Sequence, residues 1–150
     1  MHCGTNEHVY LGCMVVDYTQ QAWPVDRWPN FTRKEMECRE TGECLICQDM
    51  MDALQQIRHE LGSPMTISSG YRSPRHSIEA AKDTPGAHAT GKAVDVACDG
   101  AYAYQVLSAA LRAGFTGIGI KQTGVSRFIH LDYIRPGDGF HVLRPVIWSY

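Results

Sequence analysis

Several features that would assign a function at once are missing from the sequence. No run of about 18 or more apolar residues occurs, so the sequence predicts no membrane-spanning helix. The net charge is −2 and lysine and arginine form no run, which argues against nucleic acid as the main partner. His59 and Glu60 match half of the HExxH zinc signature, but the second histidine is replaced by Ser63, which excludes that class of metalloprotease.

Cysteine is too sparse for a disulfide scaffold, with six in 150 residues, and this fits a protein made in a reducing cytoplasm. We expect Cys38, Cys44 and Cys47 to be buried or half-buried free thiols, with a second, structural metal or a disulfide as the alternatives. A metal site could also be imagined at His2, Cys3, His8 and Cys13, but the spacing of these residues matches no standard zinc pattern.

A secretory leader is also not recognisable. Residues 1–18 lack a basic start, and their apolar run, Val9 to Val16, is short. We therefore expect a protein made in the cytoplasm without a signal peptide. Its composition, 44% hydrophobic and 20% charged, is typical of one globular domain. We expect this domain to span residues 31–150, with residues 1–30 as an extension packed on it through its two tryptophans.

Residue patterning predicts a small α+β domain. Thr32 followed by Glu35 has the form of a capping box that begins a short helix. Apolar residues that recur every three or four positions predict two main helices, at 44–61 and 101–113. Segments whose side chains alternate between two faces predict strands at 62–72, 92–97, 115–120 and 127–133. We expect an antiparallel sheet of about four strands against these helices, with Trp148 and Tyr150 closing the edge of the core.

The stretch from Ser68 to Cys98 contains the most reactive residues. His88 and Asp95 would lie about 23 Å apart in an extended strand, too far to share one ion. Zinc needs its donors at roughly 2.0 to 2.2 Å, so the chain must turn back, and Gly91 can supply the turn. The alternative interpretation is that His88 and Asp95 are a hydrogen-bonded polar pair in a loop and bind no metal.

A second alternating segment, RFIHLDY, adds another histidine. Phe128, His130 and Asp132 share one face of the predicted strand. His130 could complete a zinc site of two histidines and one carboxylate with an open position for water. Asp132 would lie about 7 Å further along the same face, within reach of that water.

These segments resemble a known family. SSGYRSP, GAHATGKAVDV, GIGI and FIHLD, in this order between about Phe31 and Trp148, are similar to the zinc D-Ala-D-Ala carboxypeptidase and L-alanyl-D-glutamate endopeptidase family. That family includes many phage endolysins and shares its fold with the hedgehog signalling domain. The resemblance implies zinc (Zn²⁺) bound by His88, Asp95 and His130.

The resemblance also implies that Arg72 binds or polarises the substrate, as a guanidinium suits a carboxylate or a carbonyl. Tyr71 and Ser73, which flank Arg72, are further candidate substrate-binding residues, but for Tyr71 we favour the simpler account, burial beneath the strand. The following polar segment, 73–85, is predicted to be a loop with a short helical turn and a solvent-facing His76.

The general base is the point at which the chain departs from the family. Several branches have an acidic residue three positions before the last zinc histidine, where this chain has Arg127, and others a histidine at the position of Phe128. Gly86 likewise replaces the usual serine. From its position on the strand we expect Asp132 to act as the base, with the alternatives His141 and Asp138.

The sequence thus predicts a zinc metallopeptidase that hydrolyses peptidoglycan stem peptides, as a carboxypeptidase or an endopeptidase. Zinc would activate water, Asp132 would accept its proton, and Arg72 would steady the oxyanion. We expect a monomer that acts on the bacterial cell wall, either phage-encoded or exported by another route. The alternative is a non-catalytic zinc-binding domain of the same fold.

Overall fold

The structure is a computed structural model that describes residues 14–150, so the N-terminal residues His2, Cys3, His8 and Cys13 lie outside it. Its helices are α2 (Arg33–Met36), α3 (Gln48–Leu61), α4 (Ser77–Ala80) and α5 (Gly100–Arg112), with short 3₁₀ turns η1 (Ala87–Thr90) and η2 (Pro136–Asp138). Its strands are β1 (Val15–Asp17), β2 (Leu45–Cys47), β3 (Thr66–Ser69), β4 (Ala93–Ala97), β5 (Gly117–Lys121), β6 (Phe128–Asp132) and β7 (Val146–Ser149).

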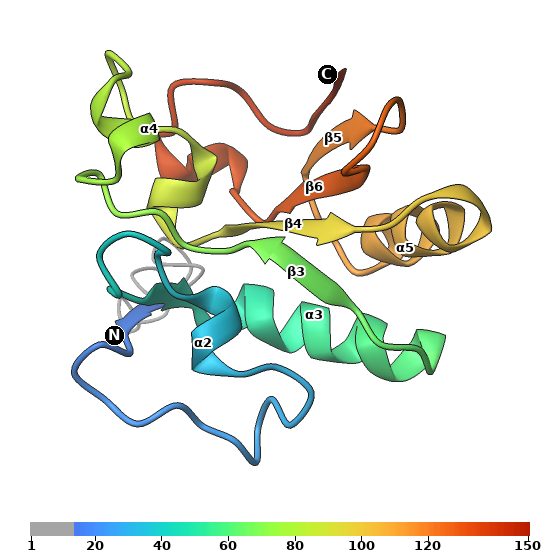
Figure 1. Cartoon of the computed structure of the whole chain (residues 1–150), viewed down its shortest axis with the longest axis horizontal. Helices are drawn as coiled ribbons and strands as arrows, with labels where there is room; N and C mark the ends of the chain where they lie inside the picture. Colours follow the sequence, from blue (N-terminus) through green and yellow to red (C-terminus); the bar gives the residue numbers. More distant parts are fainter. Residues whose placement is uncertain (1–13) are drawn as a thin grey trace, which may run out of the picture.

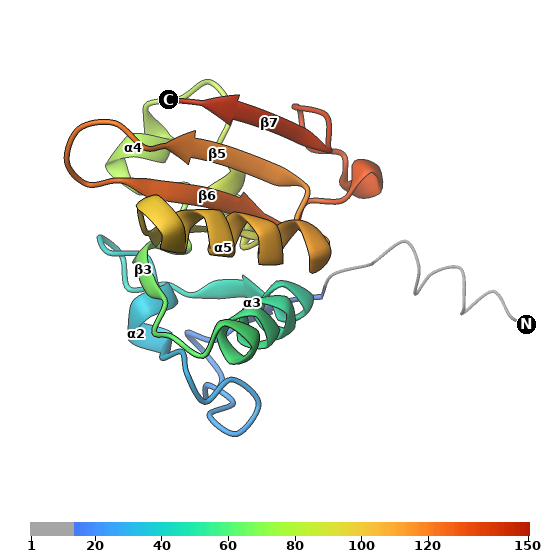
Figure 2. The same cartoon turned by 90° about the vertical axis from the view of Figure 1, so that its right-hand side faces the viewer.

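The main sheet has five strands in the order β3-β4-β6-β5-β7. Figure 2 shows β6, β5 and β7 side by side. Neighbouring strands are antiparallel except β5 and β7, which are parallel. The α+β class is confirmed, but the sheet has one more strand than we predicted. The extra strand, β7, comes from the tail, whose pairing with β5 depends on contacts that are distant in sequence.

The helices α3 and α5 pack beside each other and bury one face of this sheet (Figures 1 and 2). That face presents apolar side chains such as Val94, Val96, Ile129 and Leu131, all at most 2% exposed. Because side chains alternate along a strand, the neighbouring residues Asp95 and His130 point to the opposite face. The core therefore fixes which side of the sheet carries the polar groups.

The part of the described chain that precedes β3, with α2 and α3, lies below the sheet in Figure 1. The predicted capping box is present, because the Thr32 hydroxyl accepts from the Glu35 amide and the Glu35 carboxylate accepts from the Thr32 amide. Helix α3 begins at Gln48 rather than at residue 44, since Leu45–Cys47 forms β2, a strand paired with β1. Trp28 is fully buried and so is a packing anchor, as predicted.

Two predictions about single residues, His76 and Cys47, are wrong. His76 is buried rather than solvent-facing, since it begins α4 by accepting from the Ile78 amide and lies 3.2 Å from Glu40. Cys38 and Cys44 are buried free thiols, as expected, but Cys47 is disulfide-bonded.

No helix among residues 14–150 is long and apolar enough to cross a membrane.

Candidate metal centre

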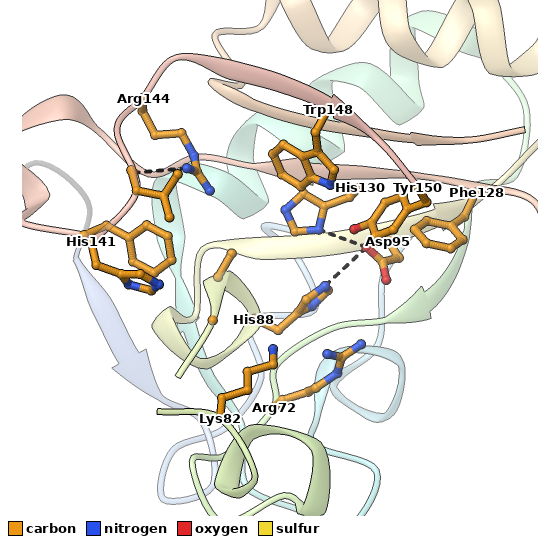
Figure 3. A pocket seen from close by; sticks show the side chains of 14 residues that line it. Arg72, Lys82, His88, Asp95, Phe128, His130, His141, Arg144, Trp148 and Tyr150 are labelled. Carbon is orange, nitrogen blue, oxygen red and sulfur yellow. Dashed lines mark hydrogen bonds and ion pairs between the residues drawn. The ribbon is translucent and has the colours of Figure 1, made fainter. Parts of the chain in front are cut away.

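Strand register places one row of residues across the polar face of the sheet. Asp95 of β4 lies opposite His130 of β6, which lies opposite Gly119 of β5, which in turn pairs with Trp148 of β7. A Cβ atom at Gly119 would meet the Trp148 ring at 2.7 Å, so only glycine leaves room for this indole. The ring centroids of Trp148 and His130 are 5.0 Å apart, and the indole thus forms a wall beside the imidazole (Figure 3).

His88 reaches the same point from the turn η1, which precedes β4. Gly91 ends this turn with a left-handed φ of 79°, and its hypothetical Cβ would meet the Leu45 carbonyl oxygen at 2.6 Å. The predicted reversal at Gly91 is therefore present. His88 Nε2 lies 3.2 Å and His130 Nδ1 3.1 Å from the same oxygen of Asp95, Oδ1 (Figure 3).

Each of the two histidines has one ring nitrogen that faces Asp95 and one that is hydrogen-bonded to another group. The second hydrogen bond decides whether the nitrogen that faces Asp95 carries a proton. His88 Nδ1 lies 2.8 Å from the Gly70 carbonyl oxygen, which can only accept, so Nδ1 carries the proton. His130 Nε2 likewise lies 2.8 Å from Asp132 Oδ2 and donates to it. In their neutral forms, both imidazoles therefore direct a lone pair at the Asp95 carboxylate.

Three acceptors that converge in this way suit a bound cation. The ligand atoms of His88, Asp95 and His130 all lie within 4.8 Å of one another, and the three residues are at most 7% exposed. Burial alone would raise the pKa of Asp95, but the neighbouring side chains of His130 and His88 outweigh burial and hold that pKa below its usual range. Two imidazole nitrogens and an ionised carboxylate, each nitrogen oriented by an outer partner, form a donor set typical of zinc.

Asp132 is the outer partner of His130 and is itself fully enclosed. Its Oδ1 accepts from Arg144 Nε at 2.8 Å and its Oδ2 from Arg144 Nη2 at 2.7 Å, in addition to the bond from His130. Gly117, opposite Asp132, makes room for this carboxylate, because a Cβ atom there would lie 2.1 to 2.3 Å from its atoms. The bonds from Arg144 and His130 outweigh burial and lower the pKa of Asp132.

An open cavity of about 460 Å³ lies over the histidines and Asp95. Its wall carries the aromatic residues Phe128, Trp148 and Tyr150 and a loop segment that includes His141, while Arg72 and Lys82 lie on the other side of His88 (Figure 3). Tyr150 is 61% exposed and therefore does not close the core, in contrast to our expectation. The site is a groove open to solvent.

The other predicted site residues are distributed differently from our expectation. Arg72 lines the cavity, but Tyr71 and Ser73 do not, because they are buried in the protein, with only 4% and 1% exposed. Asp138 lies outside the cavity and pairs with Lys92 at 2.7 Å. Substrate contact through Tyr71 and Ser73 does not fit this arrangement.

Sequence reasoning missed several residues of the site. Arg144, Lys82 and the buried Glu79 were not singled out, and Trp148 was assigned to the core. The one available signal was charge: Arg144 stands in an otherwise apolar segment, which calls for a buried acidic partner. The spacing of twelve residues between it and Asp132 gave no sign of the pair.

A family model described as Peptidase M15 matches residues 29–132. The chain belongs to the Peptidase M15 family. This is the family of zinc D-Ala-D-Ala carboxypeptidase type that the sequence resembles. Since the family consists of zinc-dependent peptidases, the chain is a metallopeptidase. The matched residues include His88, Asp95 and His130 and end at Asp132. No curated protein sequence gives a match.

Proposed function

We propose that this M15 family member is a zinc-dependent peptidase that cleaves the stem peptide of bacterial peptidoglycan. The observation that carries the proposal is the convergence of His88, Asp95 and His130 at the floor of an open groove. A purely structural zinc site is closed by four protein ligands, whereas a catalytic one leaves a position for water or substrate. Within residues 14–150 this group offers three ligands and borders a cavity.

Each residue of the groove has a distinct part in the proposed reaction. A zinc ion held by His88, Asp95 and His130 would supply Lewis acidity, which polarises a carbonyl group and lowers the pKa of water. Arg72 lines the groove with 21% of its side chain exposed, so its guanidinium can donate to a carbonyl oxygen or carboxylate of the peptide.

We propose a different role for Asp132 from the one expected from the sequence. A general base needs an oxygen that the attacking water can reach. The Asp132 side chain is 0% exposed, and both its oxygens accept bonds from Arg144 or His130. It therefore positions His130, by fixing the proton on Nε2 and leaving Nδ1 as the ligand atom.

His141 is the residue that we propose for proton transfer. It lines the cavity, is exposed, and lies in the loop between η2 and β7. Imidazole both accepts and donates a proton near neutral pH, so His141 could take the proton of the attacking water and pass it to the leaving amine. It was one of the two alternatives that the sequence left open.

The test is digestion of purified peptidoglycan by the protein with zinc and with a chelator, followed by mass spectrometry of the fragments. Zinc-dependent release of a terminal D-Ala would identify a carboxypeptidase, and cleavage between L-Ala and D-Glu an endopeptidase. Either result fits a role in phage lysis or wall remodelling. The absence of new termini at every zinc concentration would favour the non-catalytic zinc-binding domain.

A further inference from the structure

Glu79 is a buried carboxylate that links two cationic side chains at one end of the groove. Its Oε2 lies 3.2 Å from Arg72 Nη1 and 3.1 Å from Lys82 Nζ. Its Oε1 accepts from the Gly86 amide at 2.7 Å, which anchors the carboxylate to the backbone just before the His88 turn. The Glu79 side chain is 0% exposed, so its position is set by the protein interior.

The two cations, by contrast, reach the groove. Arg72 and Lys82 both line the cavity, and 21% and 42% of their side chains are exposed. Figure 3 shows them beside each other on the side of His88 that faces away from Trp148. Glu79 therefore holds them in place from behind and leaves their outer surfaces open.

The charges at this end of the groove do not balance. One carboxylate, Glu79, faces two cations, so the cluster carries an excess positive charge next to solvent. The other cation of the groove, Arg144, is already paired with Asp132. Like charges repel when they are held close together, and an incoming anion would relieve that repulsion.

We propose that Lys82, held beside Arg72 by Glu79, determines specificity by binding a free carboxylate of the substrate. This inference rests on the proposed function and adds the chemical group that the groove recognises. A stem peptide offers two such groups, the α-carboxylate of its γ-linked D-Glu and the carboxylate at its C-terminus. Lys82 contacts the anion, and Glu79 is a positioning residue.

The experiment compares three synthetic stem pentapeptides: the parent, one amidated at the D-Glu α-carboxylate, and one amidated at the C-terminus. The zinc-loaded wild type is expected to cleave the parent with a kcat/KM about tenfold higher than one of the two amides, since a charge-assisted hydrogen bond at a half-exposed lysine is lost. The amide that is cleaved poorly identifies the carboxylate.

Lys82→Met keeps the apolar stem but removes the charge, and Lys34→Met, on α2 and outside the groove, is the matched control. Lys82→Met is expected to bring the parent-to-amide ratio close to one, mainly by raising KM for the parent. Lys82→Arg should restore the ratio, while Lys34→Met should keep the wild-type value. A thermal melt of each variant checks that it is folded.

The outcomes separate this inference from the function on which it rests. A wild type that cleaves all three peptides equally, or a Lys82→Met variant with the wild-type ratio, overturns the carboxylate site and leaves the peptidase standing. A wild type that cleaves none of them with zinc present overturns the proposed function and, with it, this inference.

Discussion

The proton on each ligand histidine is fixed by a single residue outside the metal centre. For His88 that partner is the carbonyl of Gly70, and for His130 it is the carboxylate of Asp132. A backbone carbonyl cannot be removed by substitution, but a carboxylate can. Asp132 is therefore the residue at which the role of the outer partners can be measured.

Asp132→Asn should lower zinc affinity by about 10- to 100-fold, because the amide no longer fixes the His130 tautomer. It should also destabilise the fold by about 3–5 kcal/mol, since the buried Arg144 guanidinium loses its counter-charge. Competition with a zinc-binding dye and urea unfolding measure the two effects. Wild-type zinc affinity together with a large loss of kcat would instead indicate that Asp132 is the general base.

His141→Ala should reduce kcat by about 10²- to 10⁴-fold if this imidazole transfers the proton. Its side chain is exposed, so zinc affinity and thermal stability should stay at their wild-type values. His59→Ala, at an exposed position on α3, is the control. A kcat equal to that of the control would exclude His141 from proton transfer.

At the scale of elements, the site depends on two glycines of one strand. In β5, Gly117 and Gly119 lie opposite Asp132 and His130, where larger side chains would occupy the space of the Asp132 carboxylate and the Trp148 ring. The GIGI motif was recognised from the sequence as part of a resemblance. Its physical reason is that β5 must leave room for the Asp132 carboxylate and the Trp148 ring, so a side chain at either glycine would collide with them.

Gly117→Ala should destabilise the protein by about 1–3 kcal/mol, because its new methyl group would lie within 2.3 Å of the Asp132 carboxylate. Zinc affinity should fall as well, since Asp132 must shift away from His130. Gly137→Ala, which meets nothing within 4 Å, is the control. Equal urea midpoints for the two variants would contradict this close packing.

At the scale of the whole molecule, zinc should stabilise the fold, since its ligands come from η1, β4 and β6. Free zinc at 100 times its dissociation constant corresponds to about 2.7 kcal/mol. A chelator should therefore lower the melting temperature of the wild type. His88→Ala should melt at the same temperature with and without chelator, and a chelator effect in that variant would show zinc bound elsewhere.

Glu79 should make stability depend on pH on the acid side. Burial alone would raise the pKa of Glu79, but the hydrogen bonds from the Gly86 amide, Lys82 and Arg72 outweigh it and lower that pKa below 4.5. The folded state then binds fewer protons than the unfolded one, so this stabilisation is complete above about pH 4.5 and is lost as the pH falls through the lowered value.

The measurement is urea unfolding of the wild type and Glu79→Gln at about pH 6 and about pH 3.5. The wild type should lose more free energy of unfolding between the two than the variant does. Equal losses would mean that the Glu79 carboxylate has the same pKa in the folded and unfolded states.

The sequence by itself determined the class of the fold, its two main helices, the turn at Gly91 and the residues that could bind zinc. Local patterns carry this information: helical spacing, strand alternation, glycine at a reversal, and motifs in a fixed order. Alternation along β6 was enough to place His130 and Asp132 on the same face of that strand.

Only the tertiary structure decided which groups meet. The pairing of Arg144 with Asp132, the wall formed by Trp148, and the cluster of Glu79, Arg72 and Lys82 all join segments whose register is set by strand pairing and core packing. A carboxylate on the right face of a strand could be a base or a buried ion-pair partner. Its neighbours across the sheet decide between these roles, and they are not adjacent in the sequence.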